Sequence, residues 1–342
     1  MSSPQVNGRL PAQRSRGQAP ATRARAVSLV GVDENGLGPL LGPLVVTAVL
    51  ARATPAGERL ASRKLRGPLA ERVGDSKALV GYGHAALGEA WARAFARLEG
   101  PDPASPEELF QRLSLDARDA LVAPCPAQHR DLCFRDGDAF TSEVEHVDQC
   151  TRDLAALARR GIELTSARLI ALCNRRLNDA AARGTSRFTV DLHAMERHVL
   201  DARARAGEPV YAVCGKVGGY DYYSPHFGPL AGRLHVTLAE GRTESRYAFP
   251  DLGEIAFVQD ADATHVLVGL ASLVGKWARD RLTAQVLRYL RAHAPELPDA
   301  SGYHDPVTKR LVESSRAVRA ALDVEDRCFL RDVAKAAPKR RV

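Results

Sequence analysis

The stretch from Val27 to Leu50 constrains the fold of this chain more than any other. Two apolar runs rich in Val and Leu flank a short segment that contains Asp33, Glu34, glycines and prolines. This pattern is typical of a strand, a bend and a second strand. Adjacent carboxylates at the end of an apolar strand repel each other and lose hydration, so they need open solvent or a cation. A hard divalent metal ion is the natural partner, and the stretch therefore predicts a metal site at a strand end.

Composition is that of an ordinary globular protein. The chain has 342 residues, of which 45% are hydrophobic, and this supports a sizeable core in one large or two small domains. No apolar run reaches the roughly 18 residues that a membrane-spanning helix needs, and the N-terminus lacks the apolar segment of a signal peptide. The six cysteines are scattered without CxxC pairs, which predicts reduced thiols in a cytoplasmic protein.

The net charge of +7 favours a polyanionic partner such as nucleic acid. Residues 1–26 contain five arginines and no acidic residue, so we expect a disordered basic arm there. A short basic tail is expected at residues 338–342. The alternative is that the net positive charge simply reflects an Arg-rich composition and has no functional role.

The remaining chain alternates helical and strand patterns. A main domain is expected over residues 27–295, with an insertion of short helices and loops at about 80–150, and a C-terminal helical extension over 296–337. Strands are expected at Pro209–Cys214, just before Gly215, and at Glu254–Val258, with a hairpin over 233–249. Helices are expected at 84–98, from Ser105 onward, at 154–159, 166–177, 188–206, 266–290, 307–322 and 324–337.

Asp191 allows two interpretations. The segment Thr189–Leu192 resembles a strand that ends in an acidic residue, but the apolar residues Phe188, Leu192, Met195 and Val199 follow helical spacing. We therefore predict a helix that carries Asp191 and ends at Gly207.

Phosphoryl transfer on a polynucleotide needs carboxylates for metal ions and cations for the backbone. Asp262 follows the strand Glu254–Val258, and the helix after it carries Ser272, Lys276 and Arg279 at spacings that place them on one face. A basic face therefore lies just beyond an acidic residue.

Four motifs in this order resemble type 2 ribonuclease H. They are Gly31-Val32-Asp33-Glu34-Asn35-Gly36-Leu37-Gly38-Pro39 with Gly42-Pro43, then Asp75-Ser76-Lys77-Ala78-Leu79, then Asp262 with Ala271-Ser272 through Lys276 to Arg279-Asp280, and finally Ser301-Gly302-Tyr303 with Asp305-Pro306 and Thr308. The resemblance covers about residues 27–315.

The resemblance implies an α/β, RNase H-like fold, with a mixed central sheet flanked by helices. It also implies an endoribonuclease that cleaves RNA in RNA/DNA hybrids with Mg²⁺ or Mn²⁺. Carried over by motif, Asp33, Glu34 and Asp262 would be catalytic metal ligands. The substrate would be bound by Gly36, Leu37, Gly38, Lys77, Ser272, Lys276 and Tyr303.

The sequence departs from the family pattern at two positions. Leu37 stands where the family has an arginine that helps to sense the 2′-hydroxyl group at an RNA to DNA junction, so junction specificity is in doubt. Gly215 ends the central strand where the family has a third carboxylate. Asp191 could supply that carboxylate if it lies at a strand end rather than on a helix, and Asp221 could do so if the loop after Gly215 folds back.

Other interpretations stay open at this point. Asp33 and Glu34 could be turn residues, Asp262 a helix cap, Lys276 a solvated side chain and Tyr303 a packing residue. At the level of function, the alternative to an enzyme is a catalytically impaired relative that binds nucleic acid. A nuclease for DNA junctions or other structured nucleic acids is a third possibility.

Overall fold

The computed structural model describes residues 26–74, 76–81, 85–130, 132–134, 137, 139–218 and 220–331, with residues 77 and 78 described by their backbone alone. The predicted basic arm and basic tail lie outside these residues. In order, the elements are β1 (Val27–Asn35), β2 (Leu44–Ala53), α1 (Pro55–Ala61), η1 (Pro68–Glu71), α2 (Ser76–Leu79), α3 (Ala86–Glu99), α4 (Pro106–Leu113), α5 (Arg118–Val122), η2 (Ala127–His129), η3 (Leu132–Phe134), α6 (Val144–Arg159), β3 (Ile162–Leu172), α7 (Asn174–Ala182), α8 (Arg187–Ala206), β4 (Val210–Gly215), η4 (Ser224–His226), β5 (Val236–Ala239), β6 (Glu244–Phe249), β7 (Gly253–Val258), α9 (Ala261–Thr264), α10 (Val266–His293), α11 (Pro306–Ser314), α12 (Arg316–Ala321) and α13 (Asp326–Phe329).

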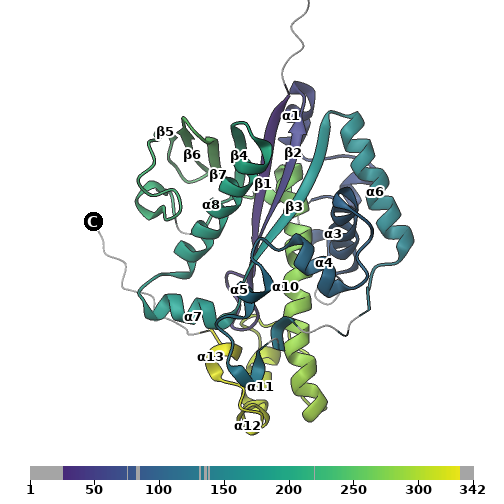
Figure 1. The fold of residues 1–342 in the computed structure, drawn as a ribbon, viewed down its shortest axis with the longest axis vertical. Helices are drawn as coiled ribbons and strands as arrows, with labels where there is room; N and C mark the ends of the chain where they lie inside the picture. Colours follow the sequence, from purple (N-terminus) through teal and green to yellow (C-terminus); the bar gives the residue numbers. More distant parts are fainter. Residues whose placement is uncertain are drawn as a thin grey trace, which may run out of the picture.

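A single mixed sheet organises these elements (Figure 1). Its strand order is β3-β2-β1-β4-β7-β6-β5. The strands β1, β4 and β7 run parallel, whereas β2, β3, β5 and β6 pair with their neighbours in the antiparallel sense. Because parallel strands end at the same edge of a sheet, the residues after β1, β4 and β7 meet there. The predicted mixed sheet with flanking helices is confirmed.

Helices cover both faces of the sheet. On one face, α3, α6 and α10 pack on β1, β2 and β3 around Trp91, Phe95 and Trp277. On the other face, α8 packs on β1, β2 and β4 around Met195, Val199 and Tyr223. Figure 1 shows α8 and the group of α3, α4 and α6 on opposite sides of the central strands.

Helix α10 lies directly against β1 because Gly31 has no side chain. A β-carbon at Gly31 would lie 2.4 Å from the carbonyl carbon of Leu267 in α10. This close approach fixes α10 beneath the end of β1, and Asn35 reinforces the packing with a side-chain hydrogen bond of 3.1 Å to the carbonyl oxygen of Ser272. The basic face of α10 is thereby held near Asp33 and Glu34.

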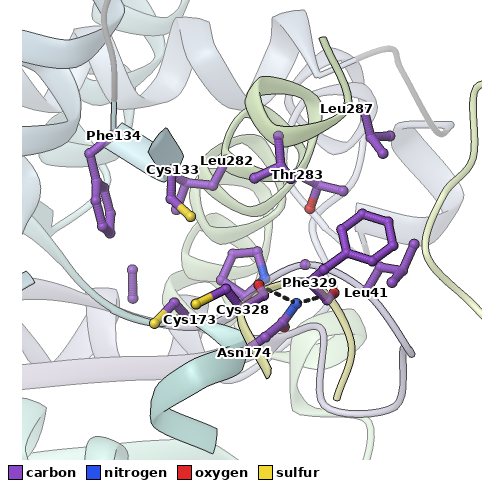
Figure 2. A pocket seen from close by; sticks show the side chains of 14 residues that line it. Leu41, Cys133, Phe134, Cys173, Asn174, Leu282, Thr283, Leu287, Cys328 and Phe329 are labelled. Carbon is purple, nitrogen blue, oxygen red and sulfur yellow. Dashed lines mark hydrogen bonds between the residues drawn. The ribbon is translucent and has the colours of Figure 1, made fainter. Parts of the chain in front are cut away.

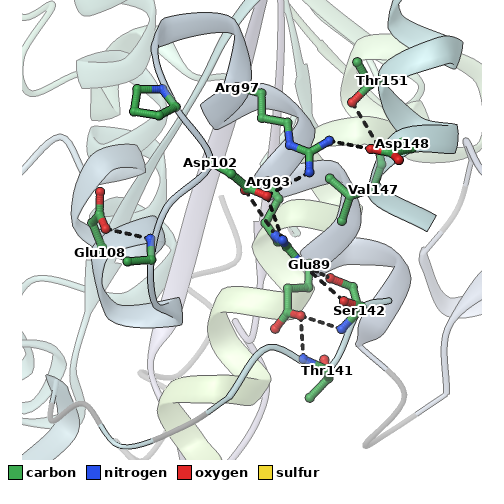
Figure 3. A network of polar contacts seen from close by, with 12 residues as sticks. Glu89, Arg93, Arg97, Asp102, Glu108, Thr141, Ser142, Val147, Asp148 and Thr151 are labelled. Carbon is green, nitrogen blue, oxygen red and sulfur yellow. Dashed lines mark hydrogen bonds and ion pairs between the residues drawn. The ribbon is translucent and has the colours of Figure 1, made fainter. Parts of the chain in front are cut away.

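The segment of residues 85–150 is tied to α10 through a buried glutamate in α3. Glu89 accepts hydrogen bonds of 2.6 Å from the backbone N–H groups of Thr141 and Ser142 (Figure 3). It accepts a further hydrogen bond of 3.1 Å from the indole N–H of Trp277 in α10. Arg93 pairs with Asp102 at 2.7 Å in the same network. A buried carboxylate with several donors is well satisfied, so Glu89 joins α3, the segment around Thr141 and α10 in one packed layer.

The C-terminal segment returns to the end of β3. There it borders a mostly apolar cavity lined by Leu41, Cys133, Cys173, Cys328 and Phe329 (Figure 2). The side-chain amide of Asn174 donates to the carbonyl oxygen of Phe329 at 2.6 Å and so fixes α13. All six cysteines of the chain are free thiols in the structure.

Most elements lie where the sequence predicts them, but two predictions are wrong. Of the expected helix over 324–337, only α13 (Asp326–Phe329) is helical among the described residues, and Leu330 instead forms a β-bridge with Leu41. The expected helix over 166–177 is instead the end of β3, followed by α7. The strand has buried residues on both faces, for example Leu169 on one and Ile170 on the other, so it shows no alternation of apolar and polar residues. The expected helix over 307–322 is divided at Ser315 into α11 and α12. In the described part of the chain, none of the helices is both long and apolar enough to cross a membrane.

Candidate metal and nucleic-acid site

Asp33 and Glu34 end β1 at the edge where the parallel strands finish. In β4, Cys214 is paired with Val32, so one further step along the strands places Gly215 beside Asp33. A β-carbon built on Gly215 would lie 3.1 Å from Oδ1 of Asp33 and 3.2 Å from Oε2 of Glu34. The carboxylate oxygens of Asp33 and Glu34 therefore both lie next to Gly215, which has no side chain.

Asp262 lies on the far side of Gly215 from Asp33. Gly215 pairs with Val258 at the end of β7, and Asp262 follows in α9. Its Oδ1 accepts a hydrogen bond of 3.0 Å from the backbone N–H of Ala263. Asp262 also lines a groove together with the exposed cations Arg63 and Lys64. The order along the sheet edge is thus Asp33, Gly215, Asp262.

Asp191 lies on helix α8, as the sequence predicts. Its side chain is fully buried, and neither carboxylate oxygen has a hydrogen-bond partner in the described part of the protein. Burial, and then the negative charge of Asp33, hold the pKa of Asp191 well above its ordinary value. Asp191 is therefore a buried acid on the helix that covers the sheet, and its pKa responds to the charge of Asp33.

Asp221, the other substitute considered for the missing acid, is engaged elsewhere. It forms an ion pair of 2.9 Å with Lys216, and half of its side chain is exposed. The backbone carbonyl oxygen of Asp221 accepts a hydrogen bond of 2.6 Å from Ser245. These contacts hold Asp221 at the loop after β4 rather than against Asp33.

The glycine-rich loop after β1 is surrounded by arginines. Gly36 has a positive φ of 90°, which favours glycine, and its carbonyl oxygen accepts a hydrogen bond of 2.6 Å from Arg331. Arg187 donates to the carbonyl oxygen of Leu37 at 3.3 Å. A β-carbon on Gly36 would lie 2.7 Å from Nε of Arg279. Three guanidinium groups thus border the loop that departs from the family pattern.

Arg331 holds this loop through hydrogen bonds to its backbone carbonyl oxygens. It is only 3% exposed and also donates to the carbonyl oxygen of Gly42 at 3.0 Å. Burial, with smaller contributions from the positive charges of Arg279 and Arg187, lowers the pKa of Arg331 to about 9. Arg279 and Arg331 are buried and Arg187 is half-buried, so Arg187 is the one of these three arginines that an anion such as a phosphate group can reach.

On α10, the predicted basic face is largely engaged within the protein. Ser272 is buried and its hydroxyl group donates to the hydroxyl group of Ser76 at 2.9 Å. Lys276 and Arg279 both pair with Asp280, at 3.2 Å and 2.8 Å. These residues position α2 and the loops around the site. The side chain of Lys77 lies outside the described residues.

Tyr303 belongs to the same corner as the glycine-rich loop. The backbone carbonyl oxygen of Gly302 accepts hydrogen bonds from Leu40 and Leu41, and His304 contacts the carbonyl oxygen of Gly38 at 3.2 Å. Tyr303 is 46% exposed, and the guanidinium group of Arg279 lies 4.9 Å from its ring centre. Gly38 has no atom within 4 Å of a built β-carbon, so its backbone faces open space.

The donor set suits a hard cation that keeps part of its water shell. Mg²⁺ is commonly held by one or two carboxylates together with waters and substrate phosphates, and the convergence of Asp33 and Glu34 above Gly215 provides such a pair. Within the described residues, no group of three or more His, Cys, Asp or Glu side chains is placed to hold one ion. Asp33 and Glu34, which both lie next to Gly215, therefore form the core of the candidate site.

Arg187 and Arg331 are site residues that the sequence did not predict. Neither belongs to a motif, and each lies far along the chain from the loop that it contacts. The positive φ of Gly36 and the buried carbonyl groups around it require donors, but no local pattern indicates which residues supply them.

No known family model matches the chain, and no curated protein matches it. Among solved structures, the chain is similar to the PCNA:RNase HII complex from Archaeoglobus fulgidus, with 14% identity, coverage of 92% of this chain and 98% of the other, and a TM-score of 0.41. It is similar to Bst-RNase HIII in complex with Mn²⁺, with 13% identity, coverage of 86% and 72%, and a TM-score of 0.36. It is also similar to ribonuclease H2 from Pyrococcus horikoshii OT3, with 14% identity, coverage of 87% and 100%, and a TM-score of 0.35. The chemistry of the site follows from its own residues.

Proposed function

We propose that this protein is a metal-dependent nuclease that hydrolyses the RNA strand of RNA/DNA hybrids. The observation that carries the proposal is the convergence of Asp33 and Glu34 above Gly215, next to a loop bordered by three arginines. Carboxylates for a divalent cation and guanidinium groups for phosphates are the two parts that phosphodiester hydrolysis needs. The motif resemblance to type 2 ribonuclease H indicates the same chemistry.

Each residue has a separate task in this proposal. Asp33 and Glu34 would hold Mg²⁺ or Mn²⁺, which supplies Lewis-acid chemistry at the scissile phosphate when it is bound. Arg187 would contact the nucleic-acid backbone. Tyr303 would pack against the ribose, while the exposed backbone of Gly38 approaches the sugar edge. Asp262 would act from the adjacent groove, where Arg63 and Lys64 attract a second stretch of backbone.

A second function is favoured by one specific observation. Gly215 brings no ligand to the centre of the sheet edge, and a two-metal site that has lost a carboxylate binds metal more weakly. A catalytically impaired protein that binds nucleic acid through the same corner is therefore the alternative to the nuclease.

The test is cleavage of a labelled RNA/DNA hybrid, and of a DNA duplex with one ribonucleotide, in Mg²⁺ or Mn²⁺. We expect cleavage of the hybrid, and we expect Asp33→Asn to reduce it by at least about a hundredfold, because loss of an outer partner of a metal ligand alone costs 10–100-fold. The matched control is Asp221→Asn, which removes a nearby carboxylate that pairs with Lys216.

Unchanged cleavage by Asp33→Asn would refute the assignment of the site. Absence of cleavage by the wild type, together with retained binding of the hybrid, would favour the impaired binding protein.

A further inference from the structure

Helix α8 begins between the two loops that leave the candidate site. Arg187, its first residue, donates a hydrogen bond of 3.3 Å to the carbonyl oxygen of Leu37 in the loop after β1. Phe188 follows, and a β-carbon built on Gly218 in the loop after β4 would lie 3.6 Å from Cε1 of its ring. Because β1 and β4 are parallel neighbours, both loops leave the sheet edge that carries the carboxylate pair. The start of α8 is therefore held at this edge.

Phe188 presents an aromatic ring to solvent at this place. The residue is 41% exposed. The ring of Tyr220 lies at 75° to the ring of Phe188, with 6.1 Å between the two ring centres. Contacts of this edge-to-face kind are favourable and fix the relative orientation of two rings. Tyr220 therefore holds Phe188 in place, while Phe188 stays exposed.

Tyr220 is itself held by two further contacts. Its ring stacks on the ring of His226, with 4.4 Å between the ring centres and an angle of 24°. Its hydroxyl group forms a hydrogen bond of 3.4 Å with the hydroxyl group of Thr189 in α8. The rings of Phe188, Tyr220 and His226 thus form a connected group, which we call the aromatic platform. A rigid platform loses little conformational entropy when a flat ligand packs on it.

Arg187 supplies a positive charge next to the aromatic platform. It directly precedes Phe188 in the helix, and among the described residues no acidic side chain forms an ion pair with it. Sites for single-stranded nucleic acid combine cations for the backbone with aromatic rings for the bases. An exposed aromatic ring alone is ordinary for a protein surface, so the adjacent charge is what specifies the ligand. Both parts of such a site are present at the start of α8.

We propose that the aromatic platform stacks an unpaired nucleobase of the strand whose phosphate group contacts Arg187. The inference rests on the proposed function for the identity of the ligand as a polynucleotide. Inside a duplex, neighbouring base pairs cover both faces of each base, so an unpaired base is the one that can lie flat on Phe188. The protein should therefore bind a hybrid with a single-stranded extension more tightly than a blunt hybrid. Little dependence on sequence is expected, because every base has a π face.

The experiment measures binding of fluorescently labelled RNA/DNA hybrids to the full chain by anisotropy, in EDTA so that no strand is cleaved. One hybrid is blunt, and the others carry a single-stranded extension at either end. Phe188→Leu keeps an apolar side chain but removes the ring, and we expect its Kd for an extended hybrid to rise by at least about fivefold, with little change for the blunt hybrid. Phe188→Trp keeps an aromatic ring and should bind as the wild type does. Tyr211→Leu is the matched control, because Tyr211 is also 41% exposed but lies at the start of β4, and this variant should leave both values of Kd unchanged.

A second measurement separates stacking from charge. When the bases of the extension are replaced by abasic sites, the wild type should lose as much affinity as Phe188→Leu loses with the normal extension. Phe188→Leu itself should not distinguish the two extensions. Its slope of log K against log salt should equal that of the wild type, because the ring carries no charge.

The two proposals fail in different ways. Binding of the extended hybrid that depends on the ring of Phe188, without cleavage of any hybrid in Mg²⁺ or Mn²⁺, would refute the nuclease and support the stacking site. Wild-type affinity of the folded Phe188→Leu variant for the extended hybrids would overturn the stacking site, whatever the cleavage assay shows. Equal binding of blunt, extended and abasic hybrids by the wild type, or no binding of any of them, would overturn it without recourse to a variant.

Discussion

Gly215→Asp places a third acidic side chain directly between Asp33 and Glu34. The β-carbon would lie 3.1 Å and 3.2 Å from their oxygens, which are the ends of flexible side chains, so the steric cost is small. The φ of Gly215 is outside the positive range, so an aspartate fits its backbone. The effect of the substitution is therefore electrostatic.

Its magnitude follows from the distances. Like charges about 4–5 Å apart repel by about 3–4 kcal/mol at an effective dielectric constant of about 20. A carboxyl group escapes this repulsion by taking up a proton, and raising its pKa from about 4 to 7 costs about 4 kcal/mol. We therefore expect the free energy of unfolding at pH 7 without metal to fall by no more than about 4 kcal/mol.

Divalent metal should reverse this loss. Each tenfold gain in metal affinity returns about 1.4 kcal/mol to the folded state at saturating metal. The assay is the thermal midpoint of unfolding with EDTA and with a series of Mn²⁺ concentrations, and hydrolysis of the RNA/DNA hybrid should rise in parallel. The control is Gly215→Asn, which has the same shape without the charge. Equal destabilisation of the two variants, with no dependence on Mn²⁺, would refute the reasoning.

Three further predictions follow from the described contacts. Arg187→Ala should weaken binding of RNA/DNA hybrids and reduce the slope of log K against log salt by about one, as expected for one lost phosphate contact, in a fluorescence anisotropy titration; an unchanged slope would remove Arg187 from the interface. Gly31→Ala should destabilise the protein by about 1–3 kcal/mol or more in thermal unfolding, because its β-carbon would lie 2.4 Å from the Leu267 carbonyl carbon; wild-type stability would show that α10 does not approach β1 so closely. Burial raises the pKa of Glu196 to about 7 from its ordinary 4.5, so the unfolded state ionises first as pH rises, and Glu196 should lower stability between those values. In urea unfolding, the free energy of unfolding of the wild type should fall as the pH rises through this range, and it should fall less in Glu196→Gln. Parallel plots of this free energy against pH for the two proteins would contradict the prediction.

Local patterns were sufficient for most of the secondary structure. The acids at the end of β1, the Ser105 cap of α4 and the glycine at 207 that ends α8 are each visible within a few residues, because strands, caps and turns depend on neighbours in sequence. The strand β3 was misread because a strand that is buried on both faces carries no alternation. Burial on both faces is a property of the packed sheet and leaves no distinct period in the sequence.

For the candidate site, the sequence by itself determined the carboxylate pair Asp33–Glu34 and the absence of an acid at Gly215. Only the tertiary structure decided that these two features meet, since β1 and β4 become neighbours through a parallel pairing across the sheet. It also brought Arg187 and Arg331 to the glycine-rich loop. The physical reason is that hydrogen bonds between strands, desolvation and charge pairing depend on distances in space. The local sequence around a residue does not determine these distances.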